Sequence, residues 1–175
     1  ALDVRDKQSI VNCVAEVIQK SSNVGSAKMA LALDRQYLWG VFNQMGLGAK
    51  TRIGFPGEAS GRVRDFKTWR PIEQATMSYG HGISLTLLQL ARAYTVFANN
   101  GVLMPVSLLK TKDTPVGTRV FSEKTADAIK DMLELVVQPG GTALRAQVAG
   151  YRVAGKTGTA HKLGPTGYEK DKYVG

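Results

Sequence analysis

The chain has 175 residues, of which 43% are apolar and 21% are charged, a composition typical of a globular protein of about one domain. Its net charge of +9 comes from basic residues that are dispersed along the chain, which disfavours a nucleic-acid-binding surface. The single cysteine, Cys13, excludes an internal disulfide and leaves the redox compartment open. No stretch reaches the roughly 18 apolar residues that a membrane span needs.

The first part of the chain is predicted to be helical. Residues 9–20 carry apolar side chains at helical spacing, and we interpret Ser9 as the N-cap. Residues 24–33 and 35–45 are predicted as two further helices, with Gly46 and Gly48 ending the second of them. The stripe expected to face inward in the first helix consists of Ile10, Val14, Val17 and Ile18.

Residues 49–83 show no sustained period and are rich in glycine and proline. A long irregular segment inside a domain is unusual and often functional. The clearest helix is predicted next, over 84–99 with Ser84 as its cap. The side chains expected to face inward in this helix are Leu87, Leu90, Ala91, Tyr94, Phe97 and Ala98.

The last third mixes extended and helical patterns. Residues 101–110 are predicted to be extended and 111–118 to form a turn-rich loop. A helix follows over about 122–137, and residues 151–154 alternate as in a strand that leads into Lys156. Ser122 is the expected cap of that helix, with Ala126, Ile129, Leu133 and Val136 facing inward.

The segment that opens at Gly150 satisfies the phosphate-binding pattern G-x-x-x-x-G-K-[ST] through Gly155, Lys156 and Thr157. That pattern needs a helix directly after it, with its N-terminus facing the phosphates. The residues that follow, TGTAHKLGPTG, contain three glycines and a proline, so no helix is expected there. A P-loop nucleotidase is therefore a disfavoured alternative, which magnesium-dependent ATP binding would test.

The same residues also contain K-T-G, a pattern that suits a strand lining a cleft. Gly158 would let a substrate backbone lie close to the strand, because it has no side chain. Lys156 would place positive charge beside a nucleophile, and Thr157 and Thr159 would offer hydroxyls. Three letters alone are a weak signal, so a partner motif is required.

The partner motif is S-x-N, supplied by Ser21-Ser22-Asn23 between two predicted helices. A hydroxyl at this place can relay a proton, and an amide can hold a substrate carbonyl. The alternative is that Ser21 and Asn23 merely cap the next helix. Residue type alone favours that alternative.

Four segments, in this order and at this spacing, resemble class B penicillin-binding proteins, the peptidoglycan D,D-transpeptidases, and above all the division-specific septal type of Gram-negative bacteria. They are IQKSSNVGSAKMA, MSYGHGISLTLLQLARAYTVFANNGVLMPVSL, VVQPGGTA and YRVAGKTGTAHK. The resemblance implies an α/β (α+β) serine β-lactamase/penicillin-binding-protein-like fold, present mostly as its helical part plus the K-T-G strand. Residues 1–175 would be a partial transpeptidase domain that lacks the upstream S-x-x-K segment and the C-terminal strands and helix.

The resemblance also implies roles for the two motifs, in an enzyme that cross-links stem peptides through a serine acyl-enzyme. A hydroxyl, an amide and an ammonium group would be catalytic, and the K-T-G segment would bind substrate. The implied catalytic residues are Ser21, Asn23 and Lys156, and the implied substrate-binding residues are Thr157, Gly158 and Thr159.

The nucleophile of this family belongs to an S-x-x-K motif at a helix N-terminus, upstream of S-x-N. The one literal S-x-x-K here, Ser107 to Lys110, follows S-x-N and lies in a segment predicted to be extended. We therefore reject it. The resemblance then predicts that the chain alone has no acylating activity, because its nucleophile is missing.

The partners implied by the resemblance are stem peptides ending in D-Ala-D-Ala, β-lactam antibiotics and divisome proteins, on the periplasmic side of the inner membrane. Self-association through an exposed sheet-facing surface is a further expectation. No cofactor is expected, and the spacing of His81 and His161 gives no metal site. A non-catalytic fragment that binds division partners remains a second alternative, supported if such binding is retained.

Overall fold

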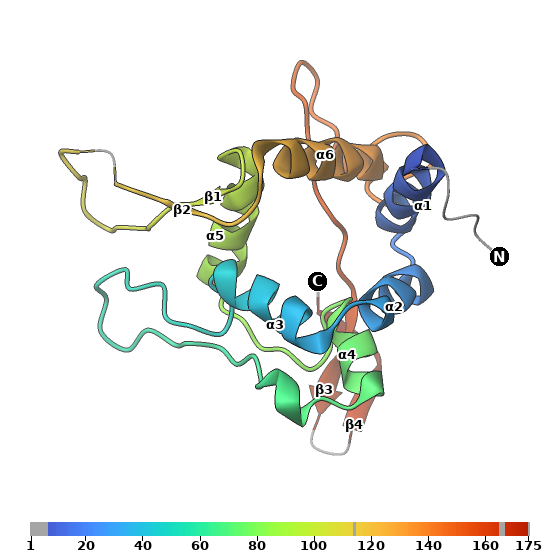
Figure 1. Cartoon of the computed structure of the whole chain (residues 1–175), viewed down its shortest axis with the longest axis horizontal. Helices are drawn as coiled ribbons and strands as arrows, with labels where there is room; N and C mark the ends of the chain where they lie inside the picture. The colour runs from blue at the N-terminus through green and yellow to red at the C-terminus, as the bar shows by residue number, and fades with distance from the viewer. Residues whose placement is uncertain (1–6, 114, 165–166, 175) are drawn as a thin grey trace. The chain divides into compact units, whose positions relative to one another are not determined.

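The computed structural model describes residues 7–113, 115–164 and 167–174 (Figure 1). The chain divides into two compact units. The first combines residues 1–22 with 131–175, and the second comprises residues 23–130. Among the helices of the described ranges, none has both the length and the apolar character to cross a membrane.

The first unit is built around a short buried turn of helix. Helix α1 (Lys7–Gln19) contacts the 3₁₀ turn η2 (Leu135–Val137), which follows α6 (Glu123–Glu134) and contacts the turn η3 (Leu144–Ala146). Val136 and Val137 of η2 are almost fully buried. The predicted helix near the N-terminus is therefore present. Ser9 is its third residue and not its N-cap, which corrects that prediction.

The strands of the first unit form a hairpin at the end of the chain. Strand β3 (Ala160–Gly164) pairs antiparallel with β4 (Gly167–Val174), and the register shifts between His161 and Leu163. The strand predicted over 151–154 is absent, because residues 151–159 have no regular secondary structure. The K-T-G residues thus precede a strand and do not lie within one.

The second unit is mainly helical. Helix α2 (Asn23–Ala32) packs on α4 (Pro71–Met77) and on α3 (Arg35–Gln44), and α3 packs on the 3₁₀ turn η1 (Phe66–Thr68). Helix α5 (Leu87–Ala98) packs on β1 (Val102–Leu103), which pairs antiparallel with β2 (Thr118–Arg119). The loop between β1 and β2 extends far beyond the two strands (Figure 1). Among the buried apolar side chains are Ala30, Trp69, Met77, Ala93 and Val96.

The two helices predicted after the first one are confirmed. Asp34 caps α3 by accepting hydrogen bonds from the backbone N–H groups of Gln36 and Tyr37, at 2.7 and 3.2 Å. The stop signals were also read correctly, since Gly46 and Gly48 have φ of +79° and +77°. Few other residues adopt that left-handed conformation without strain.

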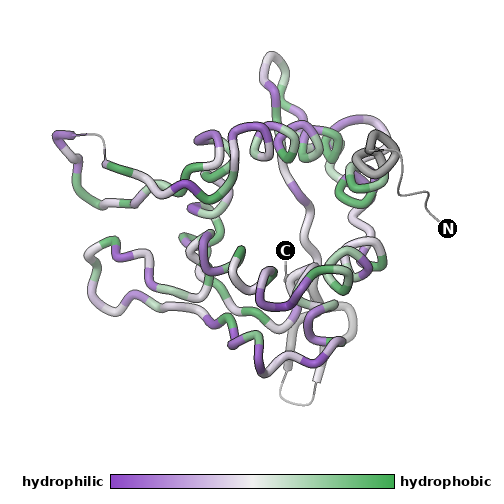
Figure 2. Tube along the Cα trace, in the orientation of Figure 1, coloured by the Kyte–Doolittle hydropathy of each residue, from purple (hydrophilic) through white to green (hydrophobic). Residues whose placement is uncertain are grey.

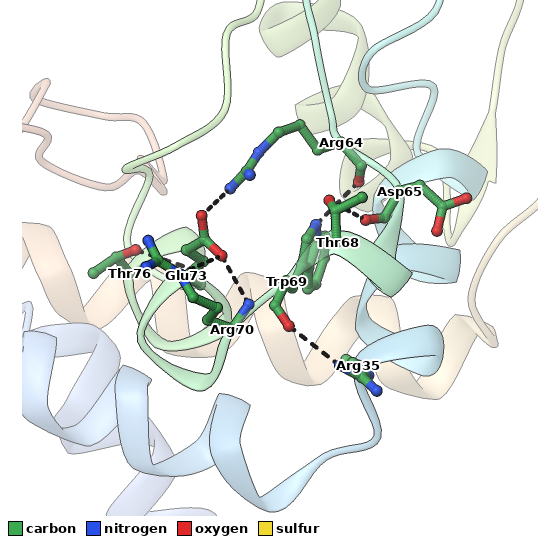
Figure 3. A network of polar contacts seen from close by, with 8 residues as sticks. All are labelled: Arg35, Arg64, Asp65, Thr68, Trp69, Arg70, Glu73 and Thr76. Carbon is green, nitrogen blue, oxygen red and sulfur yellow. Dashed lines mark hydrogen bonds and ion pairs between the residues drawn. The ribbon is translucent and has the colours of Figure 1, made fainter.

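The segment predicted to be irregular contains η1 and α4, which periodicity did not reveal. A polar network joins these two elements (Figure 3). The Glu73 carboxylate accepts a hydrogen bond from the Arg70 backbone N–H at 2.7 Å and forms an ion pair with Arg64 at 2.6 Å. These two contacts lower the pKa of Glu73 to about 2, with the Arg70 hydrogen bond as the larger cause. Arg35 of α3 joins the network by donating to the Trp69 carbonyl.

Helix α5 differs most from its prediction. Its N-cap is Thr86, whose hydroxyl accepts from the Gln89 backbone N–H, and not Ser84. The predicted inward face is also wrong, since Leu87 is 87% exposed while Gln89 is 1% exposed. The Gln89 amide donates to the carbonyls of Ala49 and Ser60 at 2.5 and 2.7 Å. A polar side chain thus occupies the buried face because it satisfies the backbone of the long irregular segment.

Helix α6 follows its prediction closely. Ser122 caps it by accepting a hydrogen bond from the Thr125 backbone N–H at 3.1 Å. Ala126 is fully buried and Leu133 nearly so. Apolar and polar residues recur along this helix (Figure 2), as expected for one face turned to a core and one to water.

Candidate active site

Helix α1 ends in a Schellman motif that places Ser21 in an unusual conformation. The Ser21 backbone N–H donates to the Ile18 carbonyl at 3.2 Å, and the Ser22 N–H donates to the Val17 carbonyl at 3.0 Å. In this motif the residue after the helix adopts the left-handed region and is usually glycine. Ser21 takes that place with φ of +55°. The turn therefore holds a serine where a residue with a Cβ is strained.

Lys156 is distant from this serine in sequence and contacts it directly. Its Nζ lies 2.5 Å from the Ser21 Oγ and 3.1 Å from the Thr157 carbonyl oxygen. Burial lowers the pKa of the Lys156 ammonium below its ordinary value. Because the ammonium donates to the Ser21 oxygen, the serine keeps its own O–H to donate elsewhere.

The K-T-G segment beside this contact is partly open to solvent. Gly158 and Thr159 are exposed, whereas Thr157 is half-buried. A Cβ built on Gly158 would meet no atom within 4 Å, so a ligand backbone has room to approach there. The Thr157 hydroxyl forms a hydrogen bond with that of Thr142 at 2.8 Å.

Two of the predicted catalytic residues, Ser21 and Lys156, are thus brought together from positions 135 apart in sequence. Asn23 is the first residue of α2, belongs to the second unit and is exposed. The contacts of the site described above are therefore those of the first unit alone. The roles of all six predicted residues stay predictions.

Residues 138–143 are the part of the site that sequence reasoning missed. The Lys20 Nζ donates to the Gly140 carbonyl at 2.7 Å, and Thr142 bonds to Thr157. The QPGGTA sequence of this loop belongs to one of the four segments that carry the family resemblance, but no role was assigned to its residues. Its two glycines and its threonine, lying between two motif segments, were the available signal.

Ser107 has the surroundings of an ordinary turn residue. Its hydroxyl donates to the Leu109 carbonyl at 2.8 Å and accepts from the Leu109 backbone N–H at 3.0 Å. The segment is an exposed loop between β1 and β2, not a helix N-terminus. These contacts agree with rejecting Ser107 as the family's S-x-x-K serine.

The phosphate-loop interpretation fails on the observed elements. In the described residues no helix follows Lys156, since residues 157–159 are irregular and β3 comes next. The helix N-terminus that would face a phosphate group is therefore missing from this place.

The site thus combines a serine at a helix end with a lysine that is followed by Thr-Gly-Thr. Residues 4–175 match the family described as penicillin binding protein transpeptidase domain. The chain belongs to this family.

The relatives agree. The chain is 44% identical to the probable peptidoglycan D,D-transpeptidase PenA of Neisseria meningitidis serogroup A, over 92% of this chain and 28% of that protein. It is 43% identical to the peptidoglycan D,D-transpeptidase FtsI of Escherichia coli K12, over 90% of this chain and 27% of that protein. The chain thus spans little more than a quarter of these relatives.

Solved structures confirm the predicted fold class. The apo transpeptidase domain of Burkholderia pseudomallei penicillin-binding protein 3 is 53% identical with a TM-score of 0.87, over 91% of this chain and 49% of that one. Penicillin-binding protein 3 of Mycobacterium tuberculosis complexed with ampicillin is 34% identical with a TM-score of 0.85, over 91% of this chain and 39% of that one. The chain spans about half of the first structure.

Proposed function

We propose that this chain forms the substrate-binding wall and proton relay of a peptidoglycan D,D-transpeptidase that cross-links stem peptides. The observation that carries the proposal is the contact between the Lys156 Nζ and the Ser21 Oγ at 2.5 Å. The names of the relatives from Neisseria and Escherichia support the reaction class. The relative solved with ampicillin supports β-lactams as ligands.

In the proposed reaction, a serine outside these 175 residues attacks the penultimate D-Ala carbonyl of a stem peptide. The bond from that carbonyl carbon to the terminal D-Ala nitrogen breaks, and an acyl-enzyme forms. The proton that the attacking serine loses is relayed through Ser21 to the departing amine, while Lys156 supplies the positive field that orients the Ser21 hydroxyl. An amine from a second stem peptide then attacks the acyl carbonyl, loses a proton and releases the enzyme serine.

The remaining residues bind the substrate. Asn23 holds the side-chain amide of the acyl group, and the hydroxyls of Thr157 and Thr159 bind the terminal carboxylate. The backbone N–H of Thr159 forms half of the oxyanion hole, and one such donor is worth about 10²–10³ in rate. The open space beside Gly158 supports a close approach of the substrate backbone there.

The setting is proposed on the same basis. The name of the FtsI relative supports peptidoglycan synthesis. A septal role, divisome partners and the periplasmic face of the inner membrane are proposed from the resemblance of the four sequence segments. No step calls on a metal ion or an organic cofactor.

The test is the intact mass after incubation with a fluorescent penicillin. Two proteins are compared, the 175-residue chain and a longer protein that adds the family's S-x-x-K segment upstream. We expect no adduct on the chain and one adduct on the longer protein. Ser21→Ala in the longer protein should slow acylation by about 10²-fold or more, the usual worth of a proton-transfer group.

The opposite results are equally clear. An adduct on the chain that Ser107→Ala abolishes would place the nucleophile within these residues. A longer protein that stays unlabelled, although it is folded by circular dichroism, would refute the transpeptidase assignment.

A further inference from the structure

We propose that the loop of residues 138–143 is a brace that links the S-x-N turn to the K-T-G segment. Lys20 and Thr142 are the positioning residues at its two ends. The inference rests on the proposed roles of Ser21 and Lys156. It gives a role to Lys20 and Thr142, which have none in the proposed function.

The loop is rooted in the core of the first unit. The Ala143 backbone N–H donates to the Val136 carbonyl at 2.9 Å, and the Gly141 N–H donates to the Gln138 carbonyl at 2.8 Å. A Cβ on Gly141 would lie 2.1 Å from the Val136 carbonyl oxygen, so the chain passes too close for any side chain. Since Val136 is fully buried, the loop cannot move far without disturbing that core.

One end of the brace holds the turn that carries Ser21. The Lys20 ammonium donates to the Gly140 carbonyl at 2.7 Å across 120 positions of sequence. Lys20 directly precedes Ser21, so this bond fixes the end of α1 against the loop. The bond is exposed to solvent, which screens the charge of its donor.

The other end holds the residue next to Lys156. The Thr142 and Thr157 hydroxyls lie 2.8 Å apart. Residues 151–159 are not paired in a strand, and the backbone near Lys156 is tied by the Gly155 N–H to the Leu133 carbonyl at 3.3 Å. A long lysine side chain on such a segment has many rotamers to lose. The Thr142 bond therefore restricts the position of Lys156.

These two contacts depend on each other, because both act through the same loop. The contact between Ser21 and Lys156 is held from one side by Lys20 and from the other by Thr142, through one rigid loop. Breaking either end disconnects the brace. Two broken ends should therefore cost little more than one, whereas independent contacts would add in free energy.

The first experiment uses the chain itself and does not depend on catalysis. The probe is competitive acetylation of lysines, followed by mass spectrometry as a function of pH. Thr142→Val keeps the shape and charge of the side chain but removes the hydroxyl, and Thr142→Ser keeps the hydroxyl. We expect the midpoint of Lys156 acetylation to move to higher pH in Thr142→Val, because a released ammonium is better solvated. In Thr142→Ser this midpoint should not change.

The second experiment uses the longer protein described above and measures its second-order acylation rate with penicillin. Lys20→Met and Thr142→Val should each lower this rate about three- to tenfold, the worth of one hydrogen bond, and the double variant about as much as one alone. Lys20→Arg should keep the native rate, since arginine still offers a charged donor to the Gly140 carbonyl. Lys28→Met, at an exposed position of α2, is the matched control.

Three results would overturn the brace. They are an unchanged Lys156 midpoint in Thr142→Val, single-variant effects that multiply in the double variant, and conservative variants as slow as the disruptive ones. Failure of the proposed function is a different result, namely no labelling of the unmodified longer protein. The acetylation midpoint then still decides whether the brace exists.

Discussion

Replacing Ser21 with glycine should leave the chain more stable than replacing it with alanine. Ser21 has φ of +55°, and this conformation costs a residue with a Cβ about 1–2 kcal/mol. Glycine avoids that cost but loses about 0.5–1 kcal/mol more conformational freedom on folding. Glycine should therefore be favoured by about 0.5–1 kcal/mol.

The comparison of the two variants isolates backbone strain. Both remove the hydroxyl and its hydrogen bond to Lys156, which is worth about 0.5–1.5 kcal/mol and cancels in the difference. Against the native serine, alanine should lose about that amount. Glycine should lie close to the native stability, because strain relief offsets the lost bond.

The assay is urea and thermal unfolding followed by circular dichroism. For a chain of this size, 1 kcal/mol corresponds to about 2–4 °C in melting temperature. The matched control is Ser78, the C-cap of α4, whose φ of −62° is right-handed. There alanine should be more stable than glycine by about 0.5–1 kcal/mol. The reasoning is refuted if alanine is also the more stable residue at position 21.

Three further expectations follow from the contacts. Gln89→Leu should destabilise the chain by about 2–4 kcal/mol in urea unfolding, because it leaves two loop carbonyls that Gln89 satisfies without partners. Glu73→Gln should make the folding stability of the chain less sensitive to acid. The folded-state pKa of about 2 lies below the ordinary 4.5, so the unfolded chain binds more protons and stability falls as the pH drops through that window. Lys156 should be acetylated with a lower pH midpoint than exposed lysines, since burial lowers its pKa.

Each of these has a result that would contradict it. Gln36→Leu changes an exposed glutamine of α3 and should move stability by less than about 0.5 kcal/mol, so a similar loss in both variants would deny Gln89 its role. Parallel stability curves for the native chain and Glu73→Gln between pH 5 and 2.5 would show that Glu73 is not responsible. A Lys156 midpoint equal to that of Lys28 would mean that Lys156 is solvated.

Local rules predicted the elements whose signals are local. Helix α6 combines a capping serine, Ser122, with apolar residues at helical spacing, and each feature requires only neighbours along the chain. The end of α3 at Gly46 is of the same kind. Ser21 and Lys156, which contact each other, were singled out through the order of the motifs and not through their geometry.

The misses have more than one physical cause, and the first is a partner distant in sequence. Gln89 is buried because it satisfies carbonyls 29 and 40 positions away, and no window of residues around it reveals that. Helix α4 has only seven residues, too few for a period to emerge. The 151–154 segment alternates like a strand but has no partner strand in the described residues, and alternation alone does not form a ladder.

Ser21 shows why the sequence could identify the residues of the site but could not predict their geometry. A Schellman turn prefers glycine at this position, and glycine would relieve the strain that the serine bears. In the proposed proton relay, serine is useful there because the left-handed turn puts its Oγ against Lys156. Part of the folding free energy is then used to hold a hydroxyl in a conformation that local propensity disfavours. The brace from Lys20 to Thr142 accounts for how that conformation is kept, since a strained residue persists only where its surroundings leave it no alternative.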